Sequence, residues 1–302
     1  MTLVARRLDD VRAALAALTF GALVIGSTPV LVRLSDCGPA AAGFWRLAFA
    51  APLLALVAAR GEGGRIGAPS GAMLLAGLAF ALDLGCWHYG IRYTSVANAT
   101  VLPNLTPILV TLAGWLVFHE RPRPVFLVGM AAAIGGAVLM AEAAPATRPG
   151  PVPHLGDALA ASTAVWYGLY FLAVRSARAD HSTGRVMLWS SLVGAPLLAV
   201  AALAMGEPIL PGSALGWLAV MGLGLAHVLG QGSIAWALGR LPASTASVTV
   251  LAQPAAAAAL AYWLFGETLT PLQVAGAALA LLGVVTAQQA PARPAPIAPE
   301  PG

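Results

Sequence analysis

The chain has 302 residues, of which 59% are hydrophobic and 9% are charged. Ordinary soluble domains contain about 45–50% apolar and about 25% charged residues, so this composition effectively excludes a soluble globular protein. The sixteen basic residues are all arginine and lie singly or in pairs between apolar segments, so the formal charge of +4 provides no basic patch for nucleic acid.

Ten apolar segments follow one another along the chain, and a helix crosses the hydrocarbon core with about 20 such residues. In chain order, the expected spans are 13–33, 39–59, 71–91, 96–118, 124–141, 155–177, 184–205, 213–236, 243–265 and 271–288. The basic start resembles a secretory signal, but no convincing small-residue cleavage site follows it, which favours a retained first helix. We therefore predict an all-α integral membrane protein with ten transmembrane helices.

The second half of the chain repeats the first. Pro107 and Glu120 recur as Pro254 and Glu267, both displaced by 147 residues (254 − 107 and 267 − 120), and the second segments of the two halves align at 144. Such internal duplication is typical of secondary transporters. The expected organisation is a five-helix repeat in residues 1–142, a Pro-rich linker in 143–154, a second five-helix repeat in 155–289 and a disordered tail in 290–302.

Arginine counting predicts the orientation. With the amino terminus inside, twelve arginines fall in cytoplasmic connectors and ends and three in outer connectors, while Arg46 lies within the membrane. This bias favours cytoplasmic termini at both ends of a multi-pass protein of the plasma (inner) membrane. Because five crossings per repeat is an odd number, the two repeats are expected to be inverted, which is the arrangement from which alternating access arises.

Two stretches carry a resemblance to a known family. YTSVANATVLPNLTPILVTLAGWLVFHERP, followed by LVGMAAAIGGAVLMA, resembles the core of an EamA domain of the drug/metabolite transporter superfamily. LPASTASVTVLAQPAAAAALAYWLFGETLTPLQVAGAALALLGVV resembles the second such domain. The resemblance implies a ten-helix carrier of a bacterial plasma membrane. It names no substrate and lends no catalytic residue.

Arg46 in segment two and Asp83 in segment three are ionisable residues inside the membrane. A centrally placed charge costs roughly 2.5–3.5 kcal/mol on insertion scales, so such residues indicate a function or a compensating partner. Their expected depths, about 10 and 12 Å from the outer boundary, allow them to meet. Either partner is then able to bind a charged substrate or a proton; a static bridge, or an Arg46 that snorkels outward, is the alternative.

Other polar and aromatic side chains accompany them in the membrane. Trp87 lies one helical turn after Asp83, and His88 follows it close to the outer boundary, where packing and proton relay are both open. His227 and Gln231 share one stripe of segment eight, either lining the pathway or bonding across helices. These two histidines, without an HExxH motif or a cysteine cluster, predict no metal site, and no cofactor is expected.

Prolines interrupt segments four and nine: Pro103, Pro107 and Pro254. Each lacks an amide hydrogen, so a carbonyl one turn earlier loses its usual partner. Polar side chains nearby are placed either to satisfy these carbonyls or to contact a ligand: Asn98, Asn104, Thr106 and Gln253. Because Pro107 and Pro254 are repeat equivalents, we expect symmetric kinks that line one cavity; packed kinks with local hydrogen bonds are the alternative.

Glu120 and Glu267 end equivalent segments, at opposite membrane faces if the repeats are inverted. For these residues, capping or gating contacts with arginines are favoured over substrate binding.

Together these features predict a secondary transporter, not an enzyme, that moves a small amino-acid-like or drug-like metabolite, with export favoured through the resemblance. The expected partners are a small-molecule substrate and the lipid bilayer, with protons as a candidate coupling ion and facilitated diffusion as the alternative. No nucleic acid is expected, and homo-oligomerisation stays open. A membrane-embedded enzyme or a receptor is the rival interpretation, but the acid and histidine groups lie at different depths and no nucleophile motif accompanies them.

Overall fold

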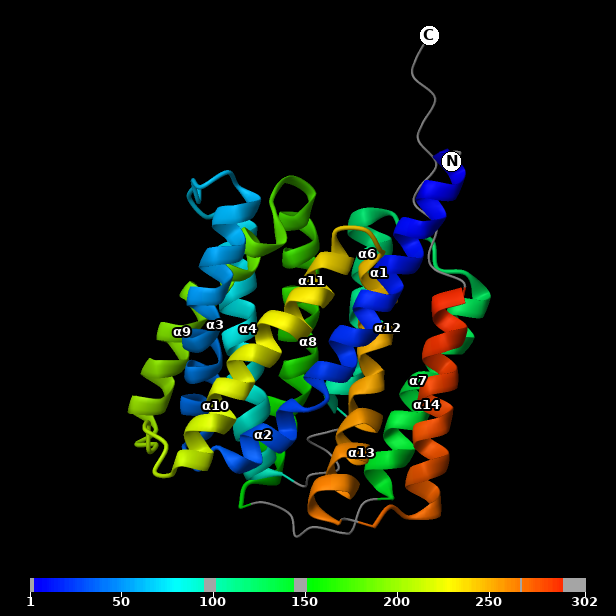
Figure 1. The fold of residues 1–302 in the computed structure, drawn as a ribbon. Coiled ribbons are helices and arrows are strands. Elements are labelled where there is room, and N and C mark those ends of the chain that lie inside the picture. Colours follow the sequence, from blue (N-terminus) through cyan, green and yellow to red (C-terminus); the bar gives the residue numbers. More distant parts are fainter. Residues whose placement is uncertain (1–2, 95–101, 144–150, 267, 290–302) are drawn as a thin grey trace.

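The computed structural model describes residues 3–94, 102–143, 151–266 and 268–289, which form a bundle of helices without strands in these ranges (Figure 1). The first half contains α1 (Leu3–Ile25), α2 (Thr28–Leu34), α3 (Pro39–Gly61), α4 (Gly71–Tyr93), the 3-10 helix η1 (Leu102–Leu105), α6 (Thr106–Phe118) and α7 (Pro124–Glu142). The second half contains α8 (Pro153–Asp180), α9 (Thr183–Ala204), α10 (Ala214–Ala226), the π-helix η2 (His227–Gln231), α11 (Gly232–Leu238), α12 (Ala243–Thr249), the 3-10 helix η3 (Val250–Ala252), α13 (Gln253–Phe265) and α14 (Pro271–Gln289).

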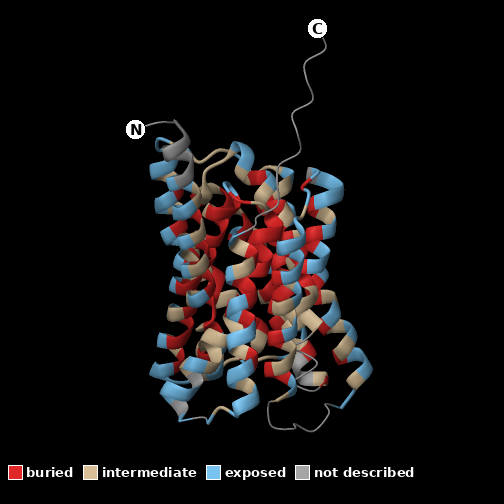
Figure 2. Cartoon of the chain, turned by 90° about the vertical axis from the view of Figure 1, so that its right-hand side faces the viewer, coloured by how far each residue is buried: buried red, intermediate tan, exposed pale blue. Residues whose placement is uncertain are grey.

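Nine helical stretches within the described ranges are long and apolar enough to cross a membrane, and a shorter apolar helix covers Leu102–Val117. This shorter helix belongs to predicted segment four, whose expected start at residue 96 lies outside the described residues. Large apolar side chains cover the outside of the bundle; Val128, Leu218 and Leu282, for example, are 66%, 65% and 65% exposed. Figure 2 shows buried residues along the centre and exposed ones around the periphery. The chain is thus an all-α membrane protein.

Local sequence signals explain where many helices begin. Pro39, Pro124 and Pro153 occupy the first turn of α3, α7 and α8, where a missing amide hydrogen costs nothing. Ser70 and Ser182 are N-caps of α4 and α9, and the hydroxyl oxygen of each accepts a hydrogen bond from a first-turn amide.

The first predicted segment is broken, which the sequence analysis did not anticipate. It divides into α1 and α2 because Pro29, in the first turn of α2, cannot donate to the carbonyl of Ile25. The hydroxyl of Thr28 donates to that carbonyl at 2.8 Å, and the hydroxyl of Ser27 donates to Val24 at 2.7 Å. The Thr28 hydroxyl therefore replaces the missing amide partner of Ile25, while the Val24 carbonyl accepts from both the amide and the hydroxyl of Ser27.

The most extensive helix contacts join the two halves. Helix α7 packs along α14, α3 along α9 and α6 against α12, and in each case the partners are equivalent segments of the two repeats. Helix α4 packs along α8 and α1 against α11, which pairs the third segment of each half with the first segment of the other. Replacing each segment by its equivalent in the other repeat therefore gives the same set of segment pairs.

Glycines bring α7 and α14 into backbone contact. A Cβ atom built on Gly129 would lie 2.8 Å from the carbonyl oxygen of Gly283, and one on Gly136 would lie 2.5 Å from that of Gly276. Gly129 corresponds to Gly276 and Gly136 to Gly283, both at 147 residues, so exchanging the halves converts one contact into the other. The pairing also shows that α7 and α14 are antiparallel. Small residues allow this close approach in a membrane, where helix association depends on packing rather than on exclusion of water.

Connectors define two faces of the bundle. The termini face carries connectors 62–70, 119–123 and 181–182, together with the start of α1 and the end of α14, at the top of Figure 1. The far face carries connectors 35–38 and 205–213, at the bottom of that view.

Candidate functional site

Arg46 and Asp83 lie inside the bundle but do not form the bridge considered from the sequence. Arg46 on α3 is 6% exposed and Asp83 on α4 is 8% exposed. Among the described residues, neither side chain takes part in an ion pair or a hydrogen bond, although the charge of Asp83 acts on Arg46 across the intervening space. Because α3 packs chiefly along α9 and α4 chiefly along α8, the two residues approach the centre from different walls.

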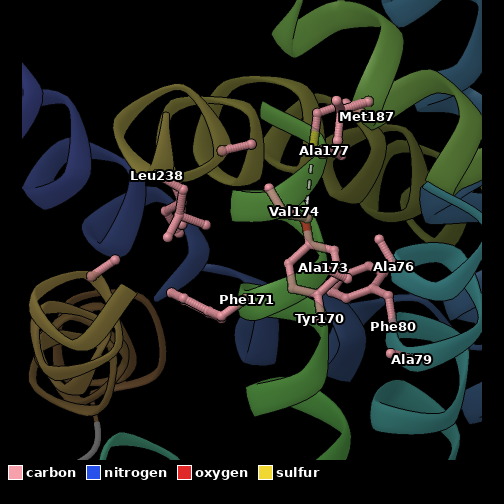
Figure 3. Packing of buried hydrophobic residues seen from close by; sticks show 14 of the residues in the cluster. Ala76, Ala79, Phe80, Tyr170, Phe171, Ala173, Val174, Ala177, Met187 and Leu238 are labelled. Carbon is pink, nitrogen blue, oxygen red and sulfur yellow. Dashed lines mark hydrogen bonds between the residues drawn. The ribbon is translucent and has the colours of Figure 1, made fainter. Parts of the chain in front are cut away.

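An aromatic cluster lies on one side of Arg46. The guanidinium carbon lies 5.3 Å from the centre of the Phe80 ring, within the range of a cation–π contact. Phe80 faces Tyr170 of α8 at 4.8 Å between ring centres, and the Tyr170 hydroxyl contacts the sulfur of Met187 at 3.6 Å (Figure 3). Tyr167, one turn before Tyr170, is stacked with it at 6.1 Å. The centre thus combines a buried cation with a rigid aromatic wall.

The π-helix η2 brings His227 and Gln231 to the same centre. His227 is 1% exposed, its Nε2 lies 3.3 Å from the hydroxyl of Ser191, and its ring lies 5.3 Å from that of Phe80. Gln231 of η2 and Gln253, at the start of α13, both lie beside the Tyr167 hydroxyl. Single π-helical turns occur frequently at functional sites. The sequence predicted a regular helix here, and the structure instead places this irregular turn in the core of the second half.

Several buried polar atoms inside the bundle have no hydrogen-bond partner. Of the nine such side-chain atoms in the described part of the chain, six belong to residues that the sequence singled out: Arg46, His88, Asn104, His227, Gln231 and Gln253. A buried donor or acceptor without a partner costs about 1–3 kcal/mol, so these atoms favour occupation by water or ligand. Asn98 and Glu267, which the sequence also singled out, lie outside the described residues.

A small cavity opens beside Arg46. It has a volume of about 20 Å³ and is lined on one side by Trp87 and His88, whose rings are 5.1 Å apart. This volume is enough for about one water molecule but not for a metabolite. A larger hollow of about 470 Å³ between α4, α8 and α9 contains no charged residue in its lining. The cavity beside Arg46 is therefore too small in this structure to hold a metabolite.

In segments four and nine, the helix changes from 3-10 to α geometry directly before the repeat-equivalent prolines. Pro107 lies in the first turn of α6, directly after η1, and Pro254 lies in the first turn of α13, directly after η3. The two repeats therefore share one local design. The Thr106 hydroxyl donates to the carbonyl of Pro103 at 2.7 Å, and the Gln253 amide donates to that of Val250. Local hydrogen bonds thus satisfy both carbonyls.

Glu120 contacts an arginine at the termini face. It lies just beyond the end of α6, is 3% exposed, and accepts hydrogen bonds from the guanidinium of Arg175 and, at 3.0 Å, from the hydroxyl of Ser244. The contact joins the first half to the second. This is the kind of structural contact that the sequence favoured for Glu120.

A cluster that we call the termini-face latch joins the α3–α4 connector to the start of α9. Glu62 accepts hydrogen bonds from the backbone amide of Ser182 and the guanidinium of Arg185, both at 3.3 Å. The indole of Trp189 donates to the carbonyl of Gly67 at 3.0 Å. Hydrogen bonding by Ser182 is the main cause that lowers the pKa of Glu62 below its ordinary value, and Arg185 contributes in the same direction.

The far-face latch is the counterpart in the other half. Glu207 in the α9–α10 connector accepts hydrogen bonds from the backbone amide of Ala41 at 3.0 Å and from the hydroxyl of Tyr89 at 2.7 Å. The indole of Trp45 donates to the carbonyl of Ile209 at 2.8 Å. In both latches, a connector glutamate accepts a hydrogen bond from a backbone amide at the start of α9 or α3 in the opposite half. The tryptophan of that same helix donates a hydrogen bond to the same connector. The two glutamates are displaced by 145 residues (207 − 62) and the two tryptophans by 144 (189 − 45).

Comparison with known proteins identifies the family. The model of the EamA-like transporter family matches residues 12–141 and, a second time, residues 154–287. The chain belongs to this family. This confirms the resemblance seen in the sequence, and the two matched ranges correspond to the two halves of the bundle.

This EamA-like transporter has distant relatives over most of its length. It is similar to an uncharacterized transporter of Archaeoglobus fulgidus, with 25% identity over 273 residues, or 90% of this chain and 95% of that protein. It is also similar to the pseudopaline exporter CntI of Pseudomonas aeruginosa, with 24% identity over 184 residues, or 59% of this chain and 60% of that protein. A solved crystal structure matches with a TM-score of 0.77 and 22% identity over 91% of this chain and 98% of that one. This last likeness shows the fold alone.

Several residues at the centre of this EamA-like transporter were not predicted from the sequence. Tyr167 and Tyr170 lie at i and i+3 of α8, a spacing that places both on one face of a helix and that the sequence displays. The latch glutamates, Glu62 and Glu207, were also visible as acidic residues in the same connector of each repeat. In the described part of the chain, no three His, Cys, Asp or Glu side chains gather closely enough to hold a metal ion.

Proposed function

We propose that this EamA-like transporter is a secondary carrier that moves a small polar or amphipathic metabolite across the plasma membrane by alternating access between two inverted repeats. The observation that carries the proposal is the pair of latches, which lie at opposite faces and interchange when the two halves are exchanged. The antiparallel glycine contacts of α7 and α14 support the inverted relation.

Opening one face while keeping the other closed requires that the two latches break separately. Glu207 and Trp45 join the halves at the far face, and Glu62 and Trp189 join them at the termini face. Because each latch has the same design, exchanging the conformations of the halves converts a state open at one face into a state open at the other. The small cavity beside Arg46 supports an occluded step in such a cycle.

Cysteine labelling from either side tests this mechanism. In a variant without the native Cys37 and Cys86, Ser190→Cys places one thiol in the buried middle of α9. Glu207→Gln is expected to raise its labelling by an impermeant thiol reagent severalfold from the far face only, and Glu62→Gln from the termini face only. Vesicles of both orientations separate the two directions.

The matched control is Glu142→Gln, since Glu142 is exposed at the end of α7 and belongs to neither latch. Labelling that rises from the same face in both latch variants, or from neither face, would contradict alternating access through these contacts.

Export is the direction we propose, and its support is the relative that is named a pseudopaline exporter. Metabolite profiles of the medium, compared between a deletion strain and an overexpressing strain, test direction and substrate together. We expect the exported compound to accumulate outside overexpressing cells and inside deleted ones. A compound that instead enters overexpressing cells faster would reverse the proposed direction.

Coupling to protons and facilitated diffusion are distinguished by Asp83, the buried acid of α4. For proton coupling, proteoliposomes should show flux that rises with an imposed pH gradient in the wild type and loses that response in Asp83→Asn. Flux that ignores the gradient in both proteins would identify facilitated diffusion.

We also propose that both termini are cytoplasmic, on the strength of the arginine bias. A carboxy-terminal fusion to green fluorescent protein should fluoresce, whereas a fusion to alkaline phosphatase should be inactive. The opposite result would reverse the assigned faces and leave the fold unchanged.

A further inference from the structure

Arg46 is a buried cation whose donors have no acceptor. Its side chain carries five N–H donors and stays protonated in proteins. In the described part of the chain it has no hydrogen bond and no ion pair, and its Nε atom is buried without a partner. An unpaired charge inside a membrane is costly, so its retention calls for a group that pairs with it during the working cycle.

The cavity beside Arg46 shows where that group would enter. Apolar and small residues form most of its lining, and Arg46 is the lining residue that carries a permanent charge; Asp83 does not line it. A carboxylate has the planar geometry that a guanidinium fork binds with two parallel hydrogen bonds. The room for about one water molecule indicates a place that solvent holds when the site is closed and that an anionic group takes over when it opens.

The surrounding rings specify the remainder of the ligand. Phe80 contacts the guanidinium and packs against Tyr170 with the ring planes tilted by 35°, and Tyr167 extends this wall along α8, next to the cavity rather than in its lining. Rings of this kind contact apolar or aromatic groups, and they shield the charge pair from water, which strengthens it.

Arg46 and Asp83, the charged residues inside the membrane, have no charged equivalent in the second half. The position equivalent to Arg46 is Ser190 (46 + 144), and the position equivalent to Asp83 is Gly230 (83 + 147) in the π-helix. A single cation in an otherwise duplicated framework cannot serve the symmetric movement of the halves. It fits a role in recognising the transported molecule.

We propose that Arg46 binds a carboxylate of the transported metabolite, so that the substrate is a small carboxylic acid or amino acid with an apolar remainder against the aromatic wall. This inference rests on the proposed carrier function. A carboxylic acid and an amino acid share the carboxylate that Arg46 would bind, and only the amino acid also carries an amine.

Equilibrium binding of matched acid and alcohol probes tests the assignment on the full chain in nanodiscs. The pairs are 3-phenylpropionate with 3-phenylpropanol, which lack an amine, and L-leucine with L-leucinol, which carry one. We expect at least one acid to bind about 10- to 100-fold more tightly than its alcohol, the range of a charge-assisted hydrogen bond. Arg46→Gln should remove this difference, and Arg46→Lys should keep part of it.

Arg60→Gln is the control variant, because Arg60 is an exposed arginine at the end of the same helix, and it should bind as the wild type does. The comparison of acid with alcohol on the wild type and Arg46→Lys stands even if Arg46→Gln fails to fold. Alcohols that bind as tightly as their acids, no binding of either acid, or unchanged acid binding in Arg46→Gln would each overturn the assignment. Flux of the bound acid in proteoliposomes is a separate readout: binding without flux would count against the carrier proposal and leave the Arg46 site in place.

Discussion

Replacing Gly136 with alanine tests whether backbone contact between α7 and α14 stabilises the bundle. A Cβ atom at this position would lie 2.3 Å from the amide nitrogen of Ala280 and 2.5 Å from the carbonyl oxygen of Gly276. Ordinary contact needs at least 3.4 Å, so the two helices must separate by about 1 Å. A gap of that size forfeits about a quarter to a half of each dispersion contact along the interface. Overpacking of this kind typically costs about 1–3 kcal/mol.

The neighbouring Gly135 supplies the control within the same helix, because a Cβ atom there meets nothing within 4 Å. Both substitutions gain about 1 kcal/mol of helix propensity, so this gain cancels in their difference. We therefore expect Gly136→Ala to have a free energy of unfolding about 1–3 kcal/mol below that of Gly135→Ala. Gly283→Ala should behave like Gly136→Ala, since its Cβ would lie 2.3 Å from the amide nitrogen of Ala133.

Denaturation of the detergent-purified variants by sodium dodecyl sulfate, followed by tryptophan fluorescence, measures these differences. If Gly136→Ala and Gly135→Ala unfold at the same denaturant concentration, the close approach contributes nothing and the reasoning is refuted.

Two further predictions concern the termini face. Because hydrogen bonding by Ser182 lowers the pKa of Glu62 in the folded state, its stabilisation is present above the ordinary glutamate pKa and is lost as pH falls through the lowered value. Wild type should therefore lose stability at acid pH more steeply than Glu62→Gln; parallel pH profiles of thermal unfolding would contradict this. Glu120→Gln should cost about 1–3 kcal/mol, because Arg175 loses its buried anionic partner while staying about a quarter exposed. Ser244→Ala should cost less, and equal losses by denaturant titration would contradict that ranking.

The sequence predicted the fold well because a membrane imposes a strong constraint on it. Apolar stretches of about 20 residues must form helices in lipid, so length and hydrophobicity were enough to place the spans. The breaks inside the spans were harder to predict. Pro29 separates α1 from α2, whereas the π-helix that starts at His227 interrupts segment eight without a proline to mark it, at a place where it packs against α1.

The candidate site was predicted residue by residue but not as an arrangement. Polarity inside an apolar segment was a sufficient signal for Arg46, Asp83 and His227, which the structure places in one interior. The distances between these side chains depend on which helices pack together, and the sequence of a single segment does not specify that packing. The expected approach of Arg46 to Asp83 rested on their similar depths in the membrane, whereas their lateral positions depend on α3 and α4, which each pack mainly against helices of the other half.

That pattern of contact has a consequence for what the duplication means. Within each half, successive helices touch one another little, and the extensive interfaces of α3, α4 and α7 are all made with the opposite half. A half expressed alone would present to lipid the glycines and buried faces that its counterpart now covers. The two ranges that match the family therefore reflect a duplication, but neither is expected to fold on its own. A chain cut between them should assemble only when both pieces are made together.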